Sequence, residues 1–239
     1  MVYFIQDTLF VALSIFLLFF LLGYMALRHR FPKGSPLLCA LILLFSSAGL
    51  SDLAFRFSPN PVVVLYADSL NLFCFVFSLA ILSHFSLVHF SKNPIWTHSK
   101  FYLILYLPAL IIAVLHTLSP LMISGIVSGP IGFQLSYNWG YWLIVIYAAL
   151  FGLHSVLLNL IIIVKNPVAA EKNHSVFLLL VLLLSLYFYN SSLILPFLYR
   201  MVNFSSPLPT TFAILILTYT FIRYHYFTLE FLEHPGSTE

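Results

Sequence analysis

The chain has 239 residues, of which 62% are hydrophobic and 7% are charged, and its formal net charge is +3. Soluble domains carry roughly 25% charged residues, so this composition excludes an ordinary soluble enzyme. The small positive charge is too weak to indicate nucleic-acid binding.

Long apolar segments recur along the whole chain, and several are followed by basic residues. The first segment spans residues 8–27 and is followed by Arg28, Arg30 and Lys33. About 20 apolar residues in a helix cross the hydrocarbon core of a membrane. The pattern predicts an all-α, seven-helix transmembrane bundle, and its spans are 8–27, 36–56, 63–89, 101–118, 140–164, 176–200 and 208–227.

The distribution of Lys and Arg predicts the orientation of the bundle. Eight of the ten lie on one side if the N-terminus is outside, and only Arg56 and Arg200 lie on the other. Because basic residues are retained on the cytoplasmic side, we expect the N-terminus outside and the C-terminus inside, in the inner (cytoplasmic) membrane of a cell. Residues 1–228 would form the membrane domain, and residues 229–239 a cytoplasmic tail or the start of a linker.

One outer loop, residues 119–139, is long enough to have structure of its own. Gly129-Pro130 is a turn signal, and Phe133, Leu135 and Tyr137 then alternate with polar residues. Alternation of period two after such a turn predicts a short β-hairpin, whose apolar side would lie over the outer mouth of the bundle. An irregular interfacial loop is the alternative.

The polar residues within the spans gather in their outer half. Asp52 and Arg56 end the second span at the spacing of a helical ion pair, and Asp68 and Asn71 share one inward face of the third. The candidate ligand-binding residues are Asp52, Arg56, Asp68, Asn71, Asn190 and Arg200. They would form either a pocket open to the outside or salt bridges that hold helix ends together, and Asp68 beside Arg56 is the expected pair.

The remaining polar residues favour no enzyme. His116, near the outer end of the fourth span, is a weaker candidate for the outer cluster. No convergent set of zinc ligands is evident, and the last span lacks the buried lysine that a retinal protein needs. We therefore expect no catalytic residues, no metal and no cofactor, and any catalytic domain would lie outside this chain.

Three segments carry a resemblance to a known family. Residues 107–121 contain a proline within a helix, residues 128–147 a Gly-Pro hairpin leading into an aromatic helix, and residues 207–231 an Arg- and Tyr-rich exit helix. This order resembles the seven-transmembrane N-terminal sensor region of bacterial histidine kinases, which is also found ahead of diguanylate cyclases. The family's kinase or cyclase domain would follow the exit helix, so we expect either a shortened sensor region or a stand-alone homologue.

The resemblance implies that the chain senses a signal and passes it to a cytoplasmic effector. Arg223 and Tyr224, at the exit of the last span, are the candidate output residues. The implied partners are the lipid bilayer, a small ligand of unknown chemistry, a cytoplasmic signalling domain or protein, and a second copy of the chain in a homodimer; no nucleic acid is expected. A small-solute transporter or permease component is the alternative.

Overall fold

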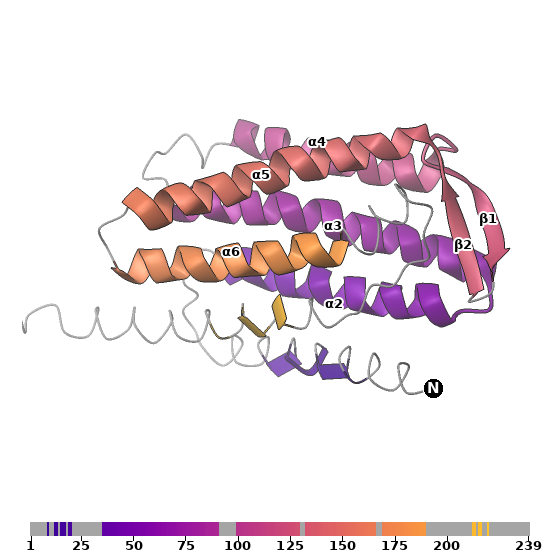
Figure 1. Ribbon diagram of the computed structural model, residues 1–239, viewed down its shortest axis with the longest axis horizontal. Coiled ribbons are helices and arrows are strands. Elements are labelled where there is room, and N and C mark those ends of the chain that lie inside the picture. The colour runs from indigo at the N-terminus through magenta and orange to yellow at the C-terminus, as the bar shows by residue number, and fades with distance from the viewer. Residues whose placement is uncertain are drawn as a thin grey trace, which may run out of the picture.

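Five long helices run side by side, and a β-hairpin lies across one end of them in the computed structural model (Figure 1). The structure describes residues 35–90, 99–129, 132–165 and 169–189, with isolated positions in 9–20 and 212–219. The helices are α2 (Ser35–Phe57), α3 (Pro61–Phe90), α4 (Ser99–Leu118), α5 (Trp142–Lys165) and α6 (Ala169–Tyr189). The strands are β1 (Ile123–Gly129) and β2 (Gly132–Tyr137), and a 3-10 turn, η2 (Trp139–Tyr141), leads into α5.

The helices begin and end close to the predicted boundaries, with one exception. Helix α6 begins at Ala169, earlier than the predicted residue 176. The prediction followed hydrophobicity alone, whereas Glu171 and Lys172 are good helix formers that extend the helix beyond its apolar part. The first and last predicted spans fall almost entirely outside the described residues.

Three of the described helical segments are long and apolar enough to cross a membrane. They are Pro61–Leu87, Phe101–Leu118 and Trp139–Lys165, and shorter apolar segments lie in α2 and α6. Large apolar side chains such as Leu103 (61% exposed) and Leu118 (78% exposed) cover the outside. Meanwhile Asp68, Asn71 and several serines are buried. Polar residues inside and apolar residues outside are what a lipid-facing bundle requires.

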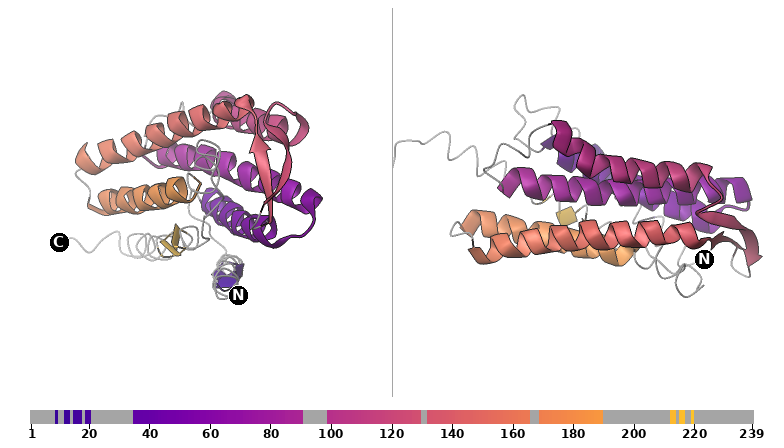
Figure 2. Two further views of the ribbon diagram at one scale, coloured as in Figure 1. Left: turned by 45° about the vertical axis from the view of Figure 1, so that its right-hand side comes forward. Right: turned by 90° about the horizontal axis from the view of Figure 1, so that it is seen from above.

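Helix α3 occupies the centre of the bundle, as the two further views show (Figure 2). It contacts α2, α4, α5 and α6, as well as β2. Its first turn is fixed by Asn60, whose Oδ1 accepts a hydrogen bond from the backbone N–H of Val62 at 2.9 Å. An Asn cap followed by Pro61 at the first helical position is a strong helix start.

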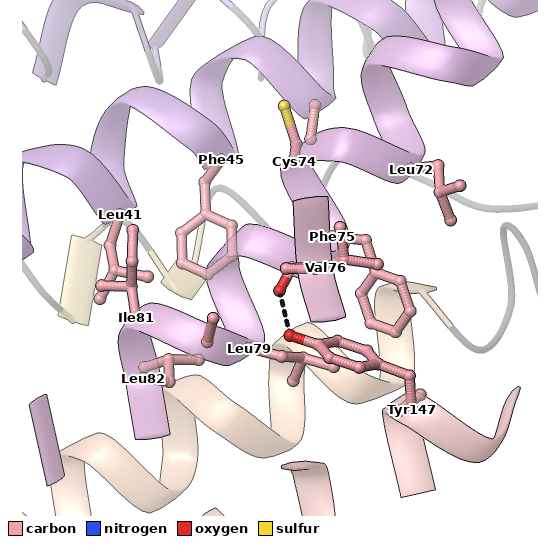
Figure 3. Packing of buried hydrophobic residues seen from close by; sticks show 14 of the residues in the cluster. Leu41, Phe45, Leu72, Cys74, Phe75, Val76, Leu79, Ile81, Leu82 and Tyr147 are labelled. Atoms are coloured by element: carbon pink, nitrogen blue, oxygen red, sulfur yellow. Dashed lines mark hydrogen bonds between the residues drawn. The ribbon is translucent and has the colours of Figure 1, made fainter. Parts of the chain in front are cut away.

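Helices α3 and α5 are parallel and share a seam of hydrogen bonds in the core. The Tyr147 hydroxyl donates to the Val76 carbonyl at 2.8 Å, between the apolar side chains of the core (Figure 3). Further along, the hydroxyls of Ser83 and Ser155 lie 2.6 Å apart. In an apolar interior each such bond satisfies groups that would otherwise be costly, so the seam fixes how the two helices align.

The hairpin predicted for residues 119–139 is confirmed. Strands β1 and β2 are antiparallel, with Ile126 opposite Leu135 and a register shift between Ile123 and Gly125. The predicted alternation also holds at its end, because Ser136 is exposed while Tyr137 is partly buried and contacts α3. The hairpin therefore docks on the bundle through one face.

The junction between the hairpin and α5 contains a close approach that only glycine allows. A Cβ atom added to Gly140 would lie 2.6 Å from the carbonyl oxygen of Leu121, whereas one added to Gly125 would meet nothing within 4 Å. Gly140 also donates its N–H to that carbonyl at 3.2 Å. The contact ties the start of β1 to the start of α5.

We expect Gly140→Ala to destabilise the protein by about 1–3 kcal/mol, as overpacking typically does. The matched variant Gly125→Ala should change stability by less than about 0.5 kcal/mol. Denaturant unfolding of the purified protein in detergent micelles measures both. Equal stability of the two variants would show that the junction relaxes freely and is not a constraint.

Candidate functional site: a buried carboxylate under the hairpin

The carboxylate of Asp68 lies at the meeting point of two helices and the hairpin. Its side chain is buried, with a residue exposure of 2%. Its Oδ2 is 2.7 Å from His116 Nε2, in the last turn of α4. Its Oδ1 accepts a hydrogen bond from the Tyr137 hydroxyl at 3.0 Å, from the end of β2. We call Asp68, Asn71, His116, Tyr137 and Tyr141 the Asp68 cluster.

Local backbone structure holds the cluster's tyrosines in place. The N–H of Asn138 donates to the carbonyl of Met122 at 2.8 Å, which closes the base of the hairpin. The Asn138 side chain accepts from the Trp139 N–H at 3.0 Å and so caps η2. These bonds hold the end of β2 and the following turn η2 beside Asp68, and with them Tyr137 and Tyr141.

The two tyrosines and His116 form an aromatic wall around the carboxylate. The ring centroids of Tyr137 and Tyr141 are 4.3 Å apart, and those of His116 and Tyr141 are 6.1 Å apart. Burial, and then the nearby Asp68, raise the pKa of Tyr137 well above its ordinary value. Tyr137 is therefore a neutral hydrogen-bond donor at every physiological pH.

The cluster has unused hydrogen-bonding capacity. Asn71 Oδ1 and His116 Nδ1 are both buried, and neither has a hydrogen-bond partner among the described residues. Asn71 lies one turn beyond Asp68 on the same buried face of α3. A buried polar atom without a partner is costly, so these atoms are where a ligand, a water or a proton would gain most. Within the described chain, no group of His, Cys, Asp or Glu is arranged to hold a metal ion.

Of the predicted site residues, the structure describes the side chains of Asp52, Asp68 and Asn71. The predicted inward face of α3 is confirmed, since Asp68, Asn71 and Ser78 are all buried. Asp52 is also buried, on α2. The side chain of Arg56 lies outside the described residues, as do Asn190, Arg200, Arg223 and Tyr224. The expected pairing of Asp68 with Arg56 therefore stays a prediction.

Sequence reasoning ranked His116 too low and did not single out Tyr137 or Tyr141 for the site. Counted from the helix ends, Asp68 is about 10 Å deep in its span and His116 only about 3 Å. The two side chains meet all the same, so the start of α3 and the end of α4 are not level. The signal for Tyr137 was the apolar face of the predicted hairpin, which places its hydroxyl toward the bundle.

We expect Asp68→Asn and His116→Gln to be strongly coupled in a double-mutant cycle of unfolding free energies. Residues in one hydrogen-bonded network typically couple by about 0.5–3 kcal/mol. Ser155→Ala is the control, because Ser155 pairs with Ser83, about 22 Å along α3 from Asp68. It should add to Asp68→Asn within about 0.5 kcal/mol. Additive effects of Asp68→Asn and His116→Gln would contradict the pairing.

Comparison with known proteins assigns no family to this site. No protein-family model matches the chain, and no curated protein sequence matches it. The function is therefore argued from the chemistry of the Asp68 cluster and from the arrangement of the helices around it.

Proposed function

We propose that the chain is a membrane-embedded signal-sensing module that acts on a cytoplasmic effector such as a histidine kinase. In this proposal it is a seven-helix bundle of a cytoplasmic membrane, with its N-terminus and the hairpin outside and its C-terminus inside. The order of features that resembles the sensor region of bacterial histidine kinases supports it.

The observation that carries the proposal is the position of Asp68. One carboxylate contacts α4 through His116 and the hairpin through Tyr137, while it sits on the central helix α3. A change in the charge or hydrogen bonding of this group alters contacts to all three elements at once. A sensor needs such a group, because a ligand shifts an equilibrium only through contacts that differ between two states.

The proposed ligand site extends from the Asp68 cluster to the other candidate residues. Asn71 contributes an unpartnered amide oxygen, and Asp52 lies buried on the neighbouring helix α2. Arg56, Asn190 and Arg200 would approach from the ends of their spans. Arg223 and Tyr224 would carry the output, since any tilt or shift of the last helix passes through its exit.

A transporter is the second candidate, and it requires a polar path through the membrane. Away from the hairpin, several of the described polar groups of α3 and α5 bind each other. Ser83 pairs with Ser155, and the Asn159 amide donates to the Ser86 hydroxyl at 3.0 Å. Groups used in this way hold helices together, which favours the sensor. Solute uptake by liposomes that contain the purified protein would instead favour the transporter.

The test is a chimera in which a histidine kinase domain is fused after Glu239. A panel of external solutes and pH values identifies a stimulus to which the wild-type fusion responds. We expect Asp68→Asn and Asn71→Leu to abolish that response at wild-type abundance in the membrane, because the first removes the charge of the site and the second removes its unpartnered amide.

Asn159→Leu is the matched control for Asn71→Leu. It makes the same chemical change in a buried amide, but far along the bundle from the cluster. It should lower protein abundance and leave the response per molecule unchanged. A normal response of both Asp68→Asn and Asn71→Leu would contradict the proposed site, and loss of response in proportion to abundance would assign the cluster a structural role only.

A further inference from the structure

We propose that the Asp68–His116 pair is a binding site for one proton, taken up from the side of the membrane on which the hairpin lies. This deepens the proposed function, because it makes the proton a ligand of the sensor. Only the effect of the bound proton on an effector depends on the proposed function. The binding itself follows from charge and geometry at the cluster.

The first step is the charge that a buried carboxylate leaves in an apolar interior. An isolated ionised carboxylate is very costly there unless a positive group pairs with it. Tyr137 donates a hydrogen bond to Asp68 but carries no charge. His116 is 2.7 Å away and is positive only when it holds a second proton. The pair therefore has a charge of −1 without that proton and of zero with it.

The second step is the place at which the proton is bound. An ionised Asp68 can only accept, so in that state Nε2 of His116, 2.7 Å from the carboxylate oxygen, carries the hydrogen of this bond. Nδ1 has no hydrogen-bond partner among the described residues, so its lone pair is available. A proton from external water adds there and forms the imidazolium, and no bond within the protein breaks. A proton also needs no cavity, unlike any larger cation.

The third step concerns the other groups that surround the pair. Tyr137 contacts the pair from β2 and Tyr141 from η2. Asn71 lies one turn beyond Asp68 on the buried face of α3, and the buried Asp52 lies on α2. Tyrosines ordinarily titrate near pH 10, so neither phenol competes for the proton near neutrality.

The rival to the proton is a permanent positive charge. Arg56 lies on α2, one turn beyond Asp52, and the sequence predicts it as a partner of Asp68. If its guanidinium neutralised the carboxylate, the imidazole would gain little from a second proton. The experiment therefore needs a variant of Arg56 as well as variants of the pair.

The experiment is a pH titration by nitrogen NMR of the full chain, labelled with ¹⁵N-histidine and embedded in lipid nanodiscs. The signal of His116 is assigned by its disappearance in His116→Gln. As the pH of the sample is lowered from about 8 to about 5, we expect Nδ1 to change from unprotonated to protonated. Asp68→Asn should lower the proton affinity of His116 at least tenfold, since it removes an adjacent negative charge.

One further variant makes the result independent of the stability of Asp68→Asn. Tyr137→Phe removes a donor from the carboxylate and so concentrates its charge, which should raise the proton affinity of His116.

Three results would overturn the proton site. They are a single protonation state of His116 across the range, an unchanged affinity in both Asp68→Asn and Tyr137→Phe, and titration that begins only in Arg56→Gln. Because the titration needs no effector, its failure leaves the sensor to be judged by the kinase fusion. Conversely, protonation of His116 in the titration, together with no response of the kinase fusion, would contradict the sensor and support the proton site.

Discussion

An ionisable side chain placed among apolar helices must find hydrogen-bond donors, and Asp68 finds them on two other elements. His116 reaches it from the last turn of α4, and Tyr137 from the end of the hairpin. Since unpaired charge in hydrocarbon is costly, separating any of these elements exposes the carboxylate to that cost. The same group thus fixes the end of α4 and the docking of the hairpin on α3.

Below the cluster, a different set of bonds holds the bundle together. Helix packing in lipid gains little from the hydrophobic effect, so hydrogen bonds and close packing between helices matter more. The bonds from Tyr147 to Val76 and between Ser83 and Ser155 align α3 with α5 (Figure 3). A perturbation at Asp68 would therefore reach a rigid pair of helices, and this suits a sensor that moves whole helices.

The length of the apolar segments was sufficient to predict helices α2 to α5, because the thickness of a membrane sets that length. Alternation of period two was sufficient to predict the hairpin, because successive side chains of a strand point to opposite faces. The start of α6 was missed because helix propensity continues past the apolar segment, at Glu171 and Lys172. Asp68 and Asn71 were found because charge in a span is rare. The partner His116 depends on how far α4 projects beside α3, and no local pattern encodes that. For Tyr137 the alternation along the hairpin indicated the face but not the contact with Asp68.

The central claim is that Asp68 holds the hairpin on the bundle, and hydrogen exchange of backbone amides tests it most directly. Amides of β1 and β2 should exchange faster in Asp68→Asn than in the wild-type protein, while those of α5 beyond Ser155 should be unchanged. Local opening of this kind is what exchange rates report. Equal exchange of the hairpin in the two proteins would contradict the claim, because the hairpin would then be held by contacts that do not involve the carboxylate.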